Sequence, residues 1–133
     1  MPSIFSRIIS GEVPGHFVHQ DERCAAFLSI APLQPGHTLV VPIDEVDEWT
    51  DADPGLLGHL ITVARDVGRA QHRVYRPVKV GLMIAGLEVP HLHLHVVPIA
   101  TVNDLDFSNA DSSATTEQLA AEAEKLRTAL ADL

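Results

Sequence analysis

Three histidines at alternate positions, His91, His93 and His95, are the residues of this chain best suited to chemistry. In a β-strand successive side chains point to opposite faces, so the three imidazoles share one face, with neighbours roughly 7 Å apart. Leucine at 92 and 94 and valine at 96 share the other face, and the β-branched residues that follow favour a strand. The pattern therefore predicts a strand over 91–98 with one apolar face and one histidine face.

Such a row of imidazoles supports three interpretations. Neutral imidazole is a nucleophile and a metal ligand, and near pH 7 it exchanges protons. The row can be a solvated or hydrogen-bonded face with no chemistry, or a metal site, because His-x-His on a strand is good ligand geometry. It can also perform covalent catalysis at phosphorus, in which one imidazole attacks and its neighbours handle phosphate charge and protons. The row alone leaves all three open.

Composition limits the class of protein. A chain of 133 residues predicts a single domain, residues 1–133. The net charge of −9 disfavours nucleic acid and anionic membranes as partners, and no apolar run approaches the roughly 18 residues of a membrane helix. The single cysteine, Cys24, excludes an internal disulfide and suits a reducing cytoplasm, and we expect it to be buried.

Helix and strand signals alternate along the chain in a way that favours an α+β domain. Short links suggest an antiparallel sheet with helices on one side. His59 lies at the side of the apolar stripe of the main helix, where packing or hydrogen bonding is the expected role. The terminal helix can pack on its own sheet or on a partner subunit. The expected helices cover 4–10, from Asp53-Pro54 to about 71, and from Thr115 onward; the expected strands cover 16–20, 24–30, 37–42 and 77–85, besides the histidine strand.

Four blocks of the chain, in the same order, resemble the HIT (histidine triad) superfamily of nucleotide hydrolases and transferases, and are most similar to its nucleoside-phosphoramidase branch. The resemblance implies a five-stranded antiparallel sheet with flanking helices, and a homodimer. It also implies attack on the α-phosphorus of a nucleotide, giving a nucleotidyl-histidine that water hydrolyses. The blocks are Ile4-Phe5-x-x-Ile8-Ile9-x-Gly11-Glu12-Val13-Pro14, Ala26-Phe27-x-x-Ile30-x-Pro32, Gly36-His37-Thr38-Leu39-Val40-Val41-Pro42 and His91-x-His93-x-His95-Val96-Val97-Pro98.

Matched positions imply a role for each histidine. His93 corresponds to the nucleophile and His95 to the contact with the phosphoryl oxygens and the leaving group. His91 corresponds to a buried residue that orients His93, and His37 supports the same network. The apolar wall around the base and ribose corresponds to Ile4, Phe5, Ile8, Phe27 and Ile30.

The substrate side departs from the family pattern at two places. Ser29 stands where the family usually has an aspartate that binds the ribose. Gly86-Leu87-Glu88-Val89 stands where Gly-Gln-x-Val is common, which replaces an amide on the phosphate side and puts the carboxylate of Glu88 nearby. We therefore keep two alternatives to a purine nucleoside phosphoramidase: a dinucleoside polyphosphate hydrolase and a non-catalytic nucleotide-binding protein.

A third departure concerns metal. Some members hold a structural zinc through Cys-x-x-Cys near the N-terminus, but the matching residues here are Ser3 and Ser6. Acidic residues near Asp44 replace the later histidine ligand, and hydroxyls are poor zinc ligands. The sequence therefore predicts no structural zinc, no other metal ligand and no cofactor.

Overall fold

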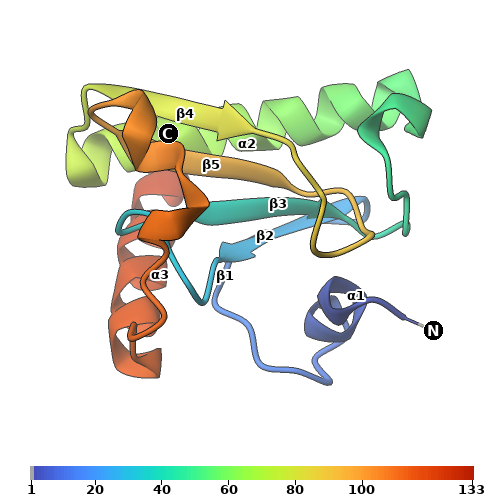
Figure 1. Cartoon of the computed structure of the whole chain (residues 1–133), viewed down its shortest axis with the longest axis horizontal. Helices are drawn as coiled ribbons and strands as arrows, with labels where there is room; N and C mark the ends of the chain where they lie inside the picture. The colour runs from blue at the N-terminus through green and yellow to red at the C-terminus, as the bar shows by residue number, and fades with distance from the viewer. Residues whose placement is uncertain (1) are drawn as a thin grey trace.

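A computed structural model describes residues 2–133 and shows a five-stranded sheet in the order β1-β2-β3-β5-β4 (Figure 1). Every neighbouring pair of strands is antiparallel. This confirms the predicted α+β class with a five-stranded antiparallel sheet. The strands are β1 (Phe17–Gln20), β2 (Cys24–Leu28), β3 (Thr38–Pro42), β4 (Lys79–Met83) and β5 (Leu94–Ile99).

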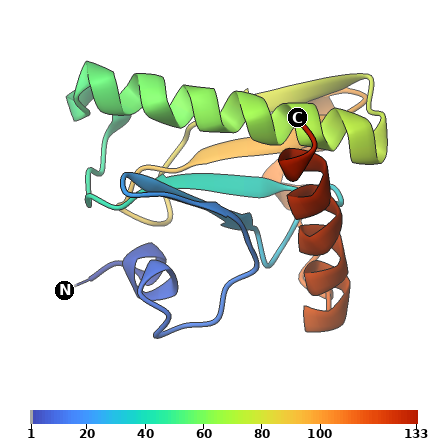
Figure 2. The same ribbon diagram turned by 180° about the vertical axis from the view of Figure 1, so that it is seen from behind.

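Helices cover both faces of the sheet. The long helix α2 (Pro54–Tyr75) and the terminal helix α3 (Thr116–Ala131) lie on one face, in front of the sheet in Figure 2, and enclose the larger core. The short helix α1 (Ile4–Ile9) packs on the opposite face through Phe5. The expectation of helices on one side only was wrong, because all residues of β2 and β3 are buried and need cover on both faces.

The ends of the helices follow the local rules of capping. The Ser3 hydroxyl accepts a hydrogen bond from the Ser6 amide and begins α1, and Asp53 caps α2 ahead of Pro54. Thr115 and Gln118 form the predicted reciprocal capping box of α3. That helix packs against α2 and β1 of its own chain, which is the first of the two placements that the sequence left open.

The histidine segment forms a strand only in its second half. Leu92, Leu94 and Val96 are buried in the core under α2, as the alternation predicts. Strand β5 begins at Leu94 rather than His91, because the Leu92 amide bonds to the Val46 carbonyl of the β3–α2 connector at 2.6 Å. The triad therefore begins outside the sheet ladder and enters it at His95.

Two connecting segments contain short 3-10 helices, η1 (Trp49–Asp51) before α2, and η2 (Val102–Leu105) and η3 (Phe107–Asn109) between β5 and α3. Strand β4 is shorter than the predicted 77–85 and lies at the sheet edge, where Leu82 is half-exposed. Within residues 2–133 none of the helices combines the length and hydrophobicity needed for a bilayer crossing.

Candidate active site

The hydrogen bonds of His93 determine which of its ring nitrogens is reactive. Its Nδ1 atom lies 2.7 Å from the backbone carbonyl of His91, which can only accept, so Nδ1 carries the proton. Nε2 therefore holds a lone pair, and no residue of 2–133 bonds to it. Among those described residues, Gln71 Oε1 is the one fully buried side-chain N or O atom without a partner. Nε2 of His93 consequently reaches solvent, where a reactant can approach it.

A chain of hydrogen bonds gives His95 the opposite tautomer to that of His93, with its proton on Nε2. The Leu33 amide donates to Nδ1 of His37 at 3.0 Å, so His37 carries its proton on Nε2. That Nε2–H lies 2.9 Å from Nδ1 of His95 and donates to it. The remaining proton of neutral His95 is then on Nε2, the nitrogen that the relay leaves free. Its ring centroid lies 4.8 Å from that of His93, so a lone pair and an N–H donor stand side by side.

Burial keeps these imidazoles neutral. Loss of hydration lowers the pKa of His37 to about 3 and that of His95 to about 4, and repulsion between neighbouring histidines adds to the effect. The pKa of His93 is also lowered by burial, although its bond to the His91 carbonyl and the charge of Glu88 act in the opposite direction. Near pH 7 the site thus presents neutral imidazoles instead of imidazolium ions.

His91 is fully buried and bonded at both nitrogens. Its Nε2–H donates to the Pro42 carbonyl at 2.8 Å, at the end of β3. Its Nδ1 accepts from the Ser3 hydroxyl at 2.6 Å, at the start of α1. The position of the His91 carbonyl, which holds His93, is therefore fixed from both sides.

Ser3 and Ser6 share a carboxylate with the connector after β3. Oε1 of Glu45 accepts the Ser3 backbone amide at 2.6 Å and the Ser6 hydroxyl at 2.7 Å. The positions that match zinc ligands elsewhere in the superfamily are thus joined by hydrogen bonds among Ser3, Ser6, Glu45 and His91. This network ties α1 to the triad.

The sequence-predicted apolar wall divides into an inner and an outer part. Phe5 packs edge-on against His93, with ring centroids 4.8 Å apart, and against Phe27 at 5.8 Å. Ile8 packs into the same cluster. Ile4 and Ile30, by contrast, are 39% and 72% exposed and belong to the surface. Phe5 is therefore the residue of the wall that contacts the histidines, and Phe27 and Ile8 belong to the apolar cluster around it.

Two of the departures from the family pattern lie at the exposed edge of this region. Ser29 is half-buried, and its hydroxyl accepts the Ala31 amide at 3.3 Å within the β2–β3 loop. Glu88 is exposed, and its negative charge acts to raise the pKa of His93. Leu87, beside it, is 94% exposed.

One residue near the histidines, Phe107, has no counterpart among the site residues that the sequence predicts. Phe107, on η3, places its ring 5.3 Å from that of His95 and remains 47% exposed. The sequence of 101–115 predicts a polar loop. Phe107 is the single aromatic residue in that segment, and this was the only feature that could have suggested a role for it in the site. The Asp111 amide bonds to the Pro32 carbonyl at 3.0 Å, which holds this segment against the loop that precedes His37.

Comparison with known proteins agrees with this geometry. Residues 10–102 match the family described as the HIT domain. The chain is 34% identical over 102 residues to an uncharacterized HIT-like protein of Borreliella burgdorferi, covering 71% of this chain and 73% of the relative.

Solved structures give the same result. A hypothetical histidine triad nucleotide-binding protein from Sulfolobus tokodaii superposes with a TM-score of 0.85 at 27% identity, covering 98% of this chain and 93% of the other. A zinc-bound histidine triad family protein from Mycobacterium smegmatis gives 0.83 at 28% identity, with 97% and 93% covered. On sequence, fold and the arrangement of its histidines, this chain belongs to the HIT family.

Proposed function

We propose that this protein is a nucleotide hydrolase or nucleotidyl transferase that acts at the α-phosphorus of a purine nucleoside phosphoramidate or a related 5′-phosphate derivative. The observation that carries the proposal is the pair of complementary tautomers. His93 presents a lone pair on Nε2, and His95 presents an N–H donor beside it. A phosphoryl centre needs both a nucleophile and a donor for the charge on its oxygens.

In the first step, the lone pair of His93 Nε2 forms a bond to phosphorus while the bond from phosphorus to the leaving group breaks. The ring then carries a positive charge, because Nδ1 keeps its proton, and the His91 carbonyl at 2.7 Å stabilises that charge. His95 Nε2–H donates to a non-bridging oxygen. The departing amine takes a proton from water, and the hydroxide that this leaves is neutralised by the proton released in the second step. The single proton of neutral His95 stays in the hydrogen bond to the phosphoryl oxygen, because Nδ1 already accepts from His37.

In the second step, water attacks phosphorus, the bond to His93 breaks and a proton leaves to solvent. Phe5, Phe27 and Ile8 supply an apolar wall for the base and ribose, and Phe107 stands on the side of His95. Ser29 and Glu88 stand on the ribose and phosphate sides by their family positions. We place this activity in a cytoplasmic homodimer, in keeping with the single cysteine and the resemblance.

The experiment uses a panel of adenosine and guanosine phosphoramidates, with dinucleoside polyphosphates as the competing substrate class. Intact-mass spectrometry of rapidly quenched protein should show one nucleotidyl adduct, located on His93 by peptide mapping. His93→Ala should abolish both turnover and adduct, and His72→Ala, at an exposed site on α2, should retain both. Nucleotide binding without turnover or adduct would instead identify a non-catalytic binding protein.

A further inference from the structure

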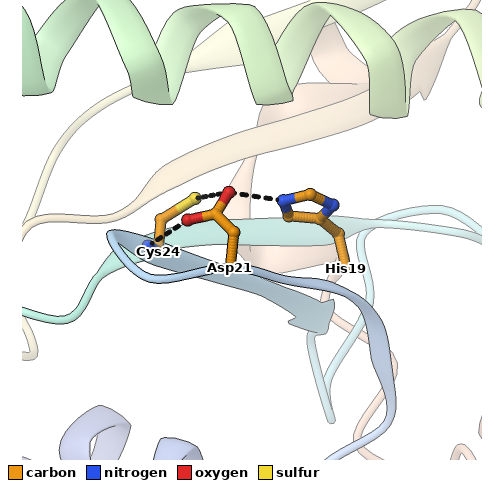
Figure 3. Close-up of side chains that lie close together, drawn as sticks. All are labelled: His19, Asp21 and Cys24. Carbon is orange, nitrogen blue, oxygen red and sulfur yellow. Dashed lines mark hydrogen bonds and ion pairs between the residues drawn. The ribbon is translucent and has the colours of Figure 1, made fainter.

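A second cluster of metal-binding side chains lies on the other face of the sheet from the triad. His19 on β1, Asp21 in the hairpin turn and Cys24 on β2 have ligand atoms within 4.8 Å of one another. Figure 3 shows the three side chains converging, with the Asp21 carboxylate between the imidazole and the thiol. Oδ2 of Asp21 lies 2.7 Å from Nε2 of His19 and 3.6 Å from the Cys24 sulfur.

Helix α2 contributes a fourth side chain. Nε2 of His59 lies 2.8 Å from the same Oδ2 atom of Asp21. Three groups that bind transition metals therefore point at one carboxylate oxygen from β1, β2 and α2. His59 was expected to pack or to form hydrogen bonds, and Cys24 was expected to be buried, and both expectations hold. No sequence pattern indicated that the two residues meet.

A β-bulge places His19 in this cluster. Phe17 pairs with Phe27 on the α1 face, and residues two apart on a regular strand share a face. The register shifts between Phe17 and His19, so His19 pairs with Ala26, whose side chain belongs to the core under α2. Bulges of this kind re-direct a side chain. Here the shift brings an imidazole to the face that holds Cys24 and His59.

We propose that His19, Asp21, Cys24 and His59 form a tetrahedral Zn²⁺ site that joins the β1–β2 hairpin to α2. Two imidazoles, a carboxylate and a thiolate are all ordinary zinc ligands, and four ligands complete a structural site. Two anionic ligands balance the charge of the ion, so the bound cluster is neutral and compatible with a buried cysteine. The site is independent of the proposed function, since it uses none of the triad residues. It would revise the expectation from the sequence that the protein holds no structural zinc.

Binding requires a defined rearrangement. Zinc bonds of about 2.0–2.3 Å place tetrahedral ligand atoms about 3.3–3.8 Å apart, so the carboxylate moves outward from its two imidazole partners. His59 is not among the ligand atoms that lie within 4.8 Å of one another, so its side chain moves toward His19 and Cys24. Each imidazole moves its proton from Nε2 to Nδ1, and the thiol proton leaves to solvent. The ion then replaces three hydrogen bonds to Asp21 Oδ2 with direct bonds.

The test titrates chelator-treated full-length protein with Co²⁺ and records its absorption. Because Cys24 is the only cysteine, a thiolate-to-cobalt charge-transfer band reports ligation by Cys24 and by no other residue. We expect the band to saturate at one Co²⁺ per chain, together with the intense visible bands of tetrahedral cobalt, and to disappear on addition of Zn²⁺. Zinc should also raise the melting temperature, because it binds only the folded chain.

Two substitutions on α2 form a matched pair. Losing a group that merely supports a metal ligand costs roughly 10–100-fold in affinity, so His59→Gln should weaken Co²⁺ binding at least about ten-fold. His72→Gln, the same change at an exposed position of the same helix, should bind Co²⁺ as the unmodified protein does. Cys24→Ala should lose the charge-transfer band. If Cys24→Ala does not fold, the Co²⁺ affinity of His59→Gln tests the site instead.

Three results would overturn the site. Co²⁺ could bind without the charge-transfer band, which would locate the ion elsewhere. His59→Gln could bind Co²⁺ as tightly as His72→Gln. The protein could also take up neither Co²⁺ nor Zn²⁺ at micromolar concentration, which would leave the cluster as a carboxylate held by hydrogen bonds.

Discussion

The hydroxyl of Ser3 lies 2.6 Å from Nδ1 of His91, although 88 residues separate the two in sequence. The same hydroxyl accepts the Ser6 amide and caps α1. One side chain therefore begins the first helix and fixes the ring that stands behind the candidate nucleophile. Helix position and triad geometry are coupled through this atom.

Replacement of Ser3 by alanine should consequently cost more than the loss of a helix cap. An N-cap contributes about 1 kcal/mol, and a buried nitrogen left without its donor costs about 1–3 kcal/mol more. We expect Ser3→Ala to lower the free energy of unfolding by at least about 2 kcal/mol, measured by urea denaturation. Ser10→Ala is the control, because its hydroxyl donates only to the exposed Arg7 carbonyl. Equal losses in the two variants would contradict a special role for Ser3.

The tautomers of the histidines can be observed directly. Long-range ¹H–¹⁵N correlation spectra of the free protein at pH 7 should show His93 protonated on Nδ1, and His37, His91 and His95 protonated on Nε2. The prediction follows from acceptors at His93 Nδ1 and His91 Nε2 and from the Leu33 amide at His37 Nδ1. His95 protonated on Nδ1 would break the relay and remove the donor from the proposed mechanism.

As the pH is lowered, the protein should begin to lose stability at a higher pH than protonation of its carboxylates alone would cause. Burial lowers the folded-state pKa of His37 to about 3 and of His95 to about 4, whereas unfolded histidine titrates near 6.5. Below about pH 6.5 the unfolded chain binds protons that the folded chain refuses, so stability falls as pH drops toward 4. Each histidine contributes a slope of up to about 1.4 kcal/mol per pH unit.

Denaturant unfolding between pH 4 and 8 measures this slope. His37→Gln should reduce the slope of the free energy of unfolding against pH by the equivalent of about one bound proton, whatever the absolute stability of the variant. His72→Gln, at an exposed site, provides the matched change in composition. A slope that is the same in both variants would mean that His37 does not resist protonation in the folded state.

We expect Ser29 to weaken the preference of the protein for ribonucleotides over 2′-deoxyribonucleotides. A carboxylate accepts charge-assisted hydrogen bonds about twice as strong as neutral ones, so its absence should cost about 1–2 kcal/mol of preference for ribose over 2′-deoxyribose, or roughly ten-fold. In a His93→Ala background, Ser29→Asp should raise the affinity ratio of adenosine to 2′-deoxyadenosine monophosphate, measured by calorimetry. Thr128→Asp, which adds the same charge on α3, should leave it unchanged. No change with Ser29→Asp would mean that this loop does not face the ribose.

The expected homodimer has a candidate surface between α2 and the edge strand β4. Ile61 and Leu82 are 45% and 49% exposed and line a groove of about 280 Å³ there. Light scattering at micromolar concentration should report a dimer, and Leu82→Lys should shift it to monomer, because a charge on an edge strand opposes pairing. Leu87→Lys, at a side chain that is 94% exposed on another segment, should remain dimeric. A monomeric unmodified protein would refute the prediction.

Local patterns predicted most of the framework. The alternation through Leu92, Leu94 and Val96 identified the buried face, and Asp53-Pro54 and Thr115-x-x-Gln118 located two helix starts, because these signals depend on neighbours in sequence. The family resemblance implied that His91 is buried, but the strand pattern itself did not predict burial of the three histidines. They share the face that α1 covers, and no local signal states where a short helix will pack.

Contacts between distant segments account for the rest. Phe107 meets His95 only because the β5–α3 segment turns back over the sheet, and a polar loop carries no periodicity that predicts such a path. The cluster at Asp21 needs a register shift in β1 and one particular turn of α2. The register shift in β1 determines whether His19 lies on the face of the sheet that packs against Phe5 or on the face that packs against His59. No pattern in the sequence predicts that shift.

The span of the histidine contacts has a kinetic consequence. His37 and His95 close a loop of 58 residues, and Ser3 and His91 close one of 88. Contacts of such long range form late in folding, because the entropy of loop closure must be overcome first. During synthesis His37 therefore cannot form its hydrogen bond to His95 until residue 95 has left the ribosome. No shorter nascent chain can hold the paired tautomers, so this arrangement of the histidines forms only when nearly the whole sheet has been made.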